Sequence, residues 1–344
     1  MGIILGIASL LCALFAAITV KPDFVPFLPD LALTEPFAQL LAMRGVLAIV
    51  FVGLGVLLLL ISAILRGFLR RFWLTRISAV VLIIAGLIHA GVVYDRGINN
   101  PGHLPKDQGI SGAQHGDGSL TVLSYNTLGG ATNTDQLADV IVNNGVDVVS
   151  LPETSTKRGQ ELLAELQKHG MKFQIFTTET PKWNPEFSST ILLISESLGK
   201  YKKVSLPMQN VPELSIVSAE PASGNGPKMI AAHPIAPTHR NIDLWKREIS
   251  AVYGLCESQK NYILAGDFNS TVDHQNALGA NCADAVAEAG SAGLGTWPAN
   301  MPALLSAPID RVLHDGATYR GQKATTVRIG NSDHRGILVR LGQQ

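Results

Sequence analysis

The residues best suited to chemistry follow apolar, strand-like runs in the last two thirds of the chain. Asn126 comes directly after the run 120–125, and Glu153 comes after the run 146–152. His233 ends a third run and is followed by prolines that restrict the backbone. Carboxylate and amide oxygens are hard ligands of the kind that Mg²⁺ prefers, and an imidazole can accept or donate a proton near neutral pH.

Three further motifs add acids, an amide and a second imidazole. Asp267 and Asn269 stand two positions apart at the end of an apolar run, so they share one face of an extended strand. Asp310 begins another run, and Asp333 and His334 stand side by side before the last one. A carboxylate beside an imidazole suits the activation of a water molecule. Each motif alone is also typical of a polar turn, so the hypothesis rests on their number and order.

The elements that must position these residues form two groups of strands with helices between them. The predicted helices are 135–144, 156–169, 240–258 and 283–289. The other predicted strands are 173–177, 189–194, 203–206, 214–219, 229–233, 262–267, 325–329 and 336–341. This order predicts a four-layer α/β sandwich, in which two packed mixed sheets are flanked by helices. Glu153 also precedes the helix 156–169, so a favourable charge at that helix N-terminus is its alternative use.

Three apolar segments precede this domain, at 2–20, 45–65 and 77–94, with 19, 21 and 18 residues. Each is long enough to cross a hydrocarbon core of roughly 30 Å as a helix. The first lacks a basic start and a clear cleavage site, although a processed signal peptide is the alternative. We expect a membrane region at 1–94 with three transmembrane helices, a flexible linker at 95–118 and a catalytic domain at 119–344.

The charges beside these segments predict their orientation. Four arginines separate the second segment from the third, whereas one lysine and three acids separate the first from the second. The arginines are Arg66, Arg70, Arg71 and Arg76. Because short basic loops stay in the cytoplasm, we expect the third segment to exit outward and to place the catalytic domain outside the cytoplasm.

Charge and cysteine content further restrict the ligands and the compartment expected for the domain. Residues 101–344 hold 20 Lys and Arg against 23 Asp and Glu, a net charge of −3. Such a domain argues against tight, sequence-independent binding of nucleic acid, which needs a basic surface. Cys256 and Cys282 are the two cysteines of the domain, and an even pair in an oxidising compartment predicts a disulfide. Two buried free thiols are the alternative.

The order of the polar motifs resembles the endonuclease/exonuclease/phosphatase superfamily. The resemblance covers about residues 119–343 and is specific for the superfamily, but it does not select a substrate. Two positions depart from the usual pattern. Pro152 precedes the motif glutamate where the family usually has Gln, and Glu196 follows Ser195 where an arginine is often found. These departures affect the expected substrate contacts and leave the expected metal ligands in place.

The resemblance implies a divalent cation, Mg²⁺ or Mn²⁺, and hydrolysis by direct attack of water. It implies Glu153 as the carboxylate ligand, with Asn126 beside it and Asp333 as a further ligand. His334, held by Asp310, would orient or deprotonate the water. Asp267 is the alternative general base, and the sequence does not choose between Asp267 and His334.

The same resemblance implies that Asn269 and His233 bind the phosphoryl oxygens of a phosphodiester substrate. The apolar segments and the lack of a basic surface favour a lipid or lipid-linked head group at the membrane as that substrate. A surface nuclease acting on DNA or RNA is the main alternative. A soluble phosphomonoesterase and a catalytically silent binding module are the others. No obligate protein partner is evident from the sequence.

Overall fold

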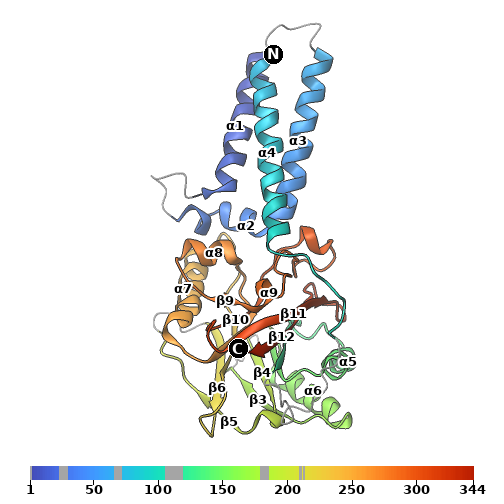
Figure 1. The fold of residues 1–344 in the computed structure, drawn as a ribbon, viewed down its shortest axis with the longest axis vertical. Helices are drawn as coiled ribbons and strands as arrows, with labels where there is room; N and C mark the ends of the chain where they lie inside the picture. Colours follow the sequence, from blue (N-terminus) through green and yellow to red (C-terminus); the bar gives the residue numbers. More distant parts are fainter. Residues whose placement is uncertain are drawn as a thin grey trace.

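The computed structural model shows a stem of long helices standing on an α/β domain (Figure 1). It describes residues 2–22, 30–65, 72–104, 119–178, 186–208, 211 and 214–344. The stem consists of α1 (Gly2–Val20), α3 (Arg44–Ile64) and α4 (Trp73–Asp95), which pack side by side. The short elements η2 (Leu31–Leu33) and α2 (Phe37–Ala42) lie where the stem meets the domain.

Two six-stranded mixed sheets form the centre of the domain, as the sequence predicts. The first has the order β11 (Tyr319–Val327), β12 (Gly336–Gln343), β1 (Leu120–Ser124), β2 (Val148–Pro152), β4 (Thr190–Ser195) and β3 (Phe173–Thr177). The second has the order β5 (Tyr201–Val204), β6 (Ser215–Pro221), β7 (Lys228–His233), β8 (Tyr262–Asp267), β10 (Asp310–His314) and β9 (Ala283–Asp284). Only the pairs β1–β2 and β7–β8 are parallel among these described strands.

Helices cover the outer face of each sheet and complete the four layers. The first sheet is covered by α5 (Thr134–Asn144) and α6 (Thr156–Lys168). The second is covered by α7 (Ile242–Ser258), with α8 (Val272–Ala277) beside it. Along β7, Met229 and Ala231 face the core between the sheets, while Ile230 and Ala232 face α7. This alternation follows from the two-residue repeat of a strand, and it explains why the four residues 229–232 are all apolar.

Local signals place the strand ends that carry the polar motifs. The side chain of Asn133 accepts hydrogen bonds from the backbone N–H groups of Asp135 and Gln136 and so caps α5. Such a cap contributes about 1 kcal/mol. Gly145 ends the helix in the left-handed region at φ 57°, where a residue without a Cβ is favoured. The chain then enters β2, which ends one residue before Glu153.

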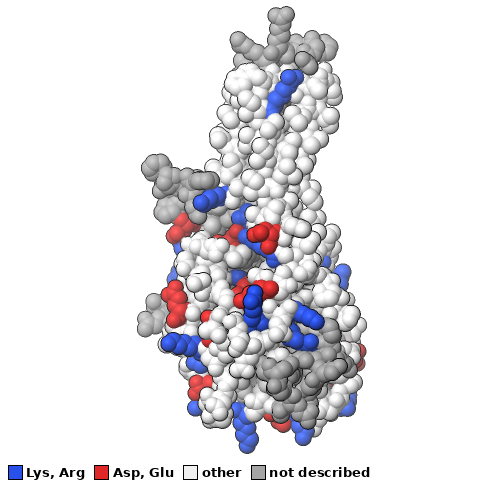
Figure 2. All heavy atoms as spheres, in the orientation of Figure 1, with Lys and Arg blue, Asp and Glu red and all other residues white. Residues whose placement is uncertain are grey.

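The stem is apolar on its outside. Of the 23 large hydrophobic side chains that are exposed in the described part of the chain, 19 lie on α1, α3 and α4. Figure 2 shows almost no charge on the visible face of the stem between its tip and its base. Because water-exposed apolar surface of this extent is unfavourable, this surface is suited to lipid.

Two of the three predicted spans, α3 and α4, are long and apolar enough to cross a membrane. The described apolar part of α1 is shorter, at Ile4–Val20. The two long helices approach closely, since a Cβ on Gly55 would lie 2.6 Å from the carbonyl oxygen of Ala79. Arg66, Arg70 and Arg71 lie outside the described residues, so the orientation stays a prediction.

Buried ion pairs join the stem to the catalytic domain. Arg44 at the start of α3 and Arg96 after α4 each place an Nη2 atom 2.8 Å from Oδ1 of Asp273 in α8. Burial opposes ionisation of this carboxyl, but the hydrogen bonds and charges of the two arginines hold the pKa of Asp273 below its ordinary value. Three buried charges are therefore satisfied only when stem and domain are docked.

Two predictions from the sequence need correction. In the described part of the predicted linker at 95–118, Asp95 belongs to α4, and several of the residues 96–104 are hydrogen-bonded to the domain. For example, the backbone N–H of Asn99 donates to Gly290 O. Residues 105–118 lie outside the described part. The predicted helix at 283–289 starts as the strand β9, which pairs with β10 before α9 (Ala285–Glu288) begins.

Candidate active site

The strand directions explain why the polar motifs meet at one edge of the two sheets. Asn126 and Glu153 follow the parallel strands β1 and β2, and Asp267 ends β8. Because β10 runs antiparallel to β8, its first residue, Asp310, pairs directly with Asp267. By the same geometry β12 begins where β1 ends, which brings His334 to this edge. A carboxyl end of one strand therefore meets an amino end of its antiparallel neighbour in both sheets.

One amide links the two sheets within the site. The Nδ2 group of Asn126 donates to Glu153 Oε1 and to Asp267 Oδ2, both at 3.0 Å. Its Oδ1 atom accepts from the backbone N–H of Leu128 at 2.9 Å. Both ends of the Asn126 side chain are thus used within the protein, and the residue holds the two carboxylates in place.

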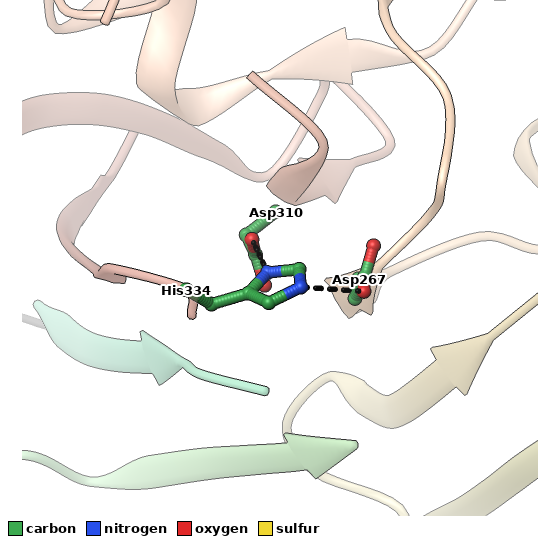
Figure 3. A group of neighbouring side chains, drawn as sticks. All are labelled: Asp267, Asp310 and His334. Atoms are coloured by element: carbon green, nitrogen blue, oxygen red, sulfur yellow. Dashed lines mark hydrogen bonds and ion pairs between the residues drawn. The ribbon is translucent and has the colours of Figure 1, made fainter. Parts of the chain in front are cut away.

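The imidazole of His334 lies between two carboxylates (Figure 3). Its Nδ1 atom is 2.8 Å from Asp310 Oδ2, and its Nε2 atom is 3.6 Å from Asp267 Oδ2. Burial disfavours the charged ring, but Asp310 and Asp267 together raise the pKa of His334 to about 10. The two acids fix both the orientation and the charge of the ring.

His233 and Asn269 complete the polar wall. The Nε2 atom of His233 lies 3.8 Å from Glu153 Oε1 and 3.7 Å from Asp267 Oδ2. The Nδ2 group of Asn269 donates to Pro234 O at 2.9 Å, so this side chain also fixes the loop after β7. His233 and Asn269 thus stand beside the two carboxylates in the lining of one cavity.

Two of these residues adopt a backbone conformation that is unusual for a residue with a Cβ. The φ angle is 52° at Glu153 and 46° at Asn269. The hydroxyl of Thr127 donates to Glu153 O at 2.7 Å, and the indole of Trp245 donates to Asn269 O at 3.0 Å. A strained backbone persists only where neighbouring groups hold it, and such strain is typical of sites in which the direction of a functional group matters.

The donor set fits a divalent cation. Oε2 of Glu153 is buried and accepts no hydrogen bond from the described residues, and burial raises the pKa of this carboxyl. Asp267, Asp310 and His334 also each offer one ligand atom within 4.8 Å of the others. In that second group His334 already contacts both acids, so a cation there would have to displace a charged ring. Glu153 is therefore the better first ligand, because its free oxygen needs a positive partner.

A cavity of about 620 Å³ opens onto this cluster. Its polar lining consists mainly of Glu153, His233, Asp267, Asn269, Asp333 and His334, all predicted from the sequence. Much of the remaining wall is apolar, with Leu128, Ile235, Trp297 and Ile309 among its residues. Neither Lys nor Arg occurs among the described residues that line the cavity.

Some lining residues were not predicted. Trp297 donates its Nε1–H to Asp333 Oδ2 at 2.9 Å, so Asp333 is held by this indole on the cavity wall. A single tryptophan in the glycine-rich stretch 290–297 was the one local signal for it. Gln39, Ala42 and Met43 also line the cavity, and no local pattern marks them.

The two cysteines of the domain form a disulfide, with 5.3 Å between their Cα atoms. Cys256 lies in the last turns of α7, and Cys282 directly precedes β9. Neither residue lines the cavity. The bridge therefore ties a covering helix to the second sheet and takes no part in the site.

Comparison with known proteins places this arrangement among related folds. The model of the Endonuclease/Exonuclease/phosphatase family matches residues 123–334. A structure titled as an endonuclease/exonuclease/phosphatase from Bacteroides vulgatus is 13% identical, with a TM-score of 0.52 over 66% of this chain and 99% of that one. Humanized D. rerio TDP2 is 17% identical, with a TM-score of 0.51 over 65% of this chain and 99% of that one.

A third structure, D. rerio TDP2 complexed with single strand DNA product, is 18% identical. Its TM-score is 0.50 over 66% of this chain and 100% of that one. At these identities the likeness shows a shared fold. No curated protein matches the sequence of this chain.

Proposed function

This chain belongs to the endonuclease/exonuclease/phosphatase family, and from that premise we propose that it hydrolyses a phosphodiester in a lipid or lipid-linked head group at a membrane, outside the cytoplasm. Members of the family are metal-dependent phosphodiesterases and nucleases. The observation that carries the proposal is a hydrolytic cluster, Glu153 with a free oxygen and His334 between two acids, in a cavity beside an apolar stem.

In this proposal Glu153 holds the cation, which is Mg²⁺ or Mn²⁺, and Asn126 keeps its carboxylate in position. The bound cation neutralises charge on the phosphoryl oxygens. His233, which lies 3.8 Å from Glu153, and Asn269 bind these oxygens from the same polar wall. Asp333 is a further ligand through its Oδ1 atom, which accepts no hydrogen bond from the described residues, while Trp297 occupies its Oδ2.

The attacking group in this proposal is water. Asp267 and the Nε2 atom of His334 lie 3.6 Å apart, so one water molecule in the cavity can reach both. Asp267 can take its proton directly, whereas His334, whose ring is charged between its two acids, can take it only after losing its own proton. Asp310 keeps the ring of His334 in place. The one hydroxyl group among the described lining residues belongs to Thr238, which makes no contact with either residue. A covalent intermediate through a hydroxyl nucleophile is therefore not favoured.

A nuclease is the second candidate, and the likeness to the TDP2 fold supports it. Binding of single-stranded nucleic acid combines a basic groove with aromatic side chains on which bases stack. The described lining offers one tryptophan and neither Lys nor Arg. The charge of the cavity therefore favours a substrate with one phosphate group near apolar substituents.

The test uses the full chain in detergent or lipid nanodiscs. We expect release of phosphorylated head group from phospholipid vesicles, loss of this activity with EDTA, and recovery with Mg²⁺ or Mn²⁺. The variant His334→Gln serves as the inactive control. Cleavage of plasmid DNA at a higher rate than any phospholipid would establish the nuclease instead.

The proposed location rests on the apolar helices, the disulfide and the arginines between the second and third segments. A stable structural disulfide is typical of an oxidising compartment. Fusion of a reporter that is active only in the cytoplasm to Gln344 tests the location, and we expect no signal. An active reporter would place the catalytic domain in the cytoplasm.

A further inference from the structure

We propose that α2 and the residues joining it to α3 form the substrate-selecting wall of the active site, so that the apolar part of a lipid phosphoester is bound along Ala42 and Met43 while its phosphate reaches Glu153 and His334. This inference rests on the proposed phosphoesterase function and adds the residues that choose the substrate.

The first observation is a shared cavity. Gln39, Ala42 and Met43 line the same space as Glu153 and His334, although more than 100 residues separate the two groups in sequence. Met43 directly precedes Arg44, the first residue of α3. The wall of the catalytic cavity therefore continues without interruption into a helix that is apolar and long enough to cross a membrane.

The second observation is that this wall is built into the domain. His274 is buried, and its Nε2 atom lies 3.0 Å from Ala38 O, while its Nδ1 atom accepts from Thr271 N–H at 2.8 Å. Leu33 and Ala38 pack in the core around Trp245. The side chain of Gln39 donates to Pro237 O, another residue of the cavity wall. Apolar burial and directed hydrogen bonds thus hold α2 at a fixed position over the site.

The third observation is a pair of exposed aromatic side chains on α4, which indicates where the surfaces of a membrane would lie. Trp73 and Tyr94, near the two ends of α4, are 65% and 72% exposed. At a rise of about 1.5 Å per residue the distance between them is about 31 Å, the thickness of a hydrocarbon core. Aromatic side chains are enriched at both interfaces of a bilayer, so Tyr94 marks the interface on the side of the catalytic domain.

Parts of the catalytic domain reach the same level. A Cβ on Gly293 would lie 2.1 Å from Val93 O, directly before Tyr94, and a Cβ on Gly45 would lie 1.8 Å from Leu304 O. Leu304 is 46% exposed at this position, beside the base of α3. The segment that carries Trp297 and Leu304 therefore lies at the interface, and the rim of the cavity lies there with it.

The fourth observation is the mixed lining of the cavity. Part of the lining consists of carboxylates and imidazoles, whereas another part consists of apolar side chains that include Met43, Ile235 and Ile309. A phosphoester with an apolar substituent satisfies both parts. A strand of nucleic acid would place charged phosphates against the apolar part of the lining, where no Lys or Arg occurs among the described residues to receive them.

The test compares two substrates of the full-length protein in nanodiscs. The first is phospholipid of the nanodisc or of added vesicles, and the second is bis(p-nitrophenyl) phosphate, a soluble phosphodiester. The measured quantity is the ratio of kcat/KM for lipid to kcat/KM for the soluble diester. We expect Met43→Gln to lower this ratio about 10-fold, the discrimination typical of one or two methylene groups in an apolar pocket.

Met171→Gln is the matched control, because Met171 is also partly buried but packs in the core under α5 and α6. We expect it to leave the ratio unchanged. Ala42→Phe, which fills the wall without adding polarity, provides a second variant in case Met43→Gln fails to fold. It should also lower the ratio, because it narrows the path of the lipid.

The outcomes separate this inference from the function it rests on. A parent protein that hydrolyses neither substrate would overturn the phosphoesterase proposal. A parent that hydrolyses both, with a ratio that neither Met43→Gln nor Ala42→Phe changes, would overturn only the selecting role of α2. Hydrolysis of the soluble diester and of DNA without any lipid hydrolysis would overturn the lipid substrate.

Discussion

The Nδ1 atom of His334 lies 2.8 Å from Oδ2 of Asp310, while the other ring nitrogen faces Asp267 in the cavity. The pair connects the start of β12 in one sheet with the start of β10 in the other. The geometry of the ring therefore depends on how the two sheets are packed, and any hydrolysis that uses the ring depends on Asp310 as well.

We predict that Asp310→Asn and His334→Gln each lower kcat by about 100-fold to 10,000-fold, the usual contribution of a positioned acid or base. The double variant should be scarcely slower than either single variant, because the two residues act as one unit. Steady-state rates on bis(p-nitrophenyl) phosphate measure this. Losses that multiply in the double variant would show that the two side chains act separately.

Glu153→Gln is predicted to weaken cation binding, because it removes the charge of a carboxylate whose Oε2 atom is buried and accepts no hydrogen bond from the described residues. Isothermal titration of the EDTA-treated protein with MnCl₂ is the measurement. Glu220→Gln, which alters an acid paired with Lys202 on the edge of the second sheet, is the control and should bind as the parent does. Equal affinity in Glu153→Gln and the parent would exclude Glu153 as a ligand.

The buried His274 predicts a loss of stability in mild acid. Burial lowers the pKa of His274 to about 4, below its ordinary value of 6.5. The unfolded chain therefore binds a proton between these values that the folded protein does not, so the stabilisation is complete above about pH 6.5 and declines as the pH falls towards 4. The full effect is about 3 kcal/mol by the usual conversion of a pKa shift.

Thermal unfolding in detergent between pH 4 and 7.5 tests this prediction. The slope of Tm against pH should become shallower in His274→Gln. The exposed His103, changed in the same way to Gln, should leave the slope as it is in the parent. A parent Tm that does not change over this range would show that His274 is not held neutral.

Asp273→Asn should destabilise the protein by about 3–5 kcal/mol, since it leaves Arg44 and Arg96 buried without their shared carboxylate. Because the folded state lowers the pKa of Asp273, its stabilisation is present above about pH 4 and is lost as the pH falls further. The Tm of the variant at neutral pH measures the effect, with the exposed Asp243→Asn as control. A Tm equal to that of the parent would mean that the ion pairs contribute nothing to docking.

The sequence was sufficient to predict the layers of the domain and the polar side of the cavity. Buried strands are marked by apolar runs, and a carboxylate such as Glu153 directly behind such a run is a local signal. The strand order then follows from the family resemblance. Asn126, Asp267 and His334 meet because the ends of their strands lie at one edge of the two sheets. The apolar runs and the order of the polar motifs along the sequence together predict this meeting.

The apolar side of the cavity could not be predicted in this way. Met43 lines the same cavity as Glu153 because α2 docks through His274, and that contact joins positions 38 and 274 without any local pattern. The polar, glycine-rich composition of residues 96–104 predicts a flexible linker. A segment that is hydrogen-bonded to the domain can have the same composition, so the sequence does not distinguish the two cases. Asn100 shows the difference, since its side chain bonds Thr325 and Thr326 in β11.

The docking of residues 96–104 limits the reach of the enzyme. A catalytic domain on a loose tether could sample phosphates at many heights above a bilayer, including those at the far end of a long lipid-linked saccharide. Here the descending chain is fastened to the domain directly after α4, and the cavity is held against the base of the stem. Under the proposed function, only bonds near the acyl chains come within reach of the cavity, so the helices would act as a ruler for the position of cleavage.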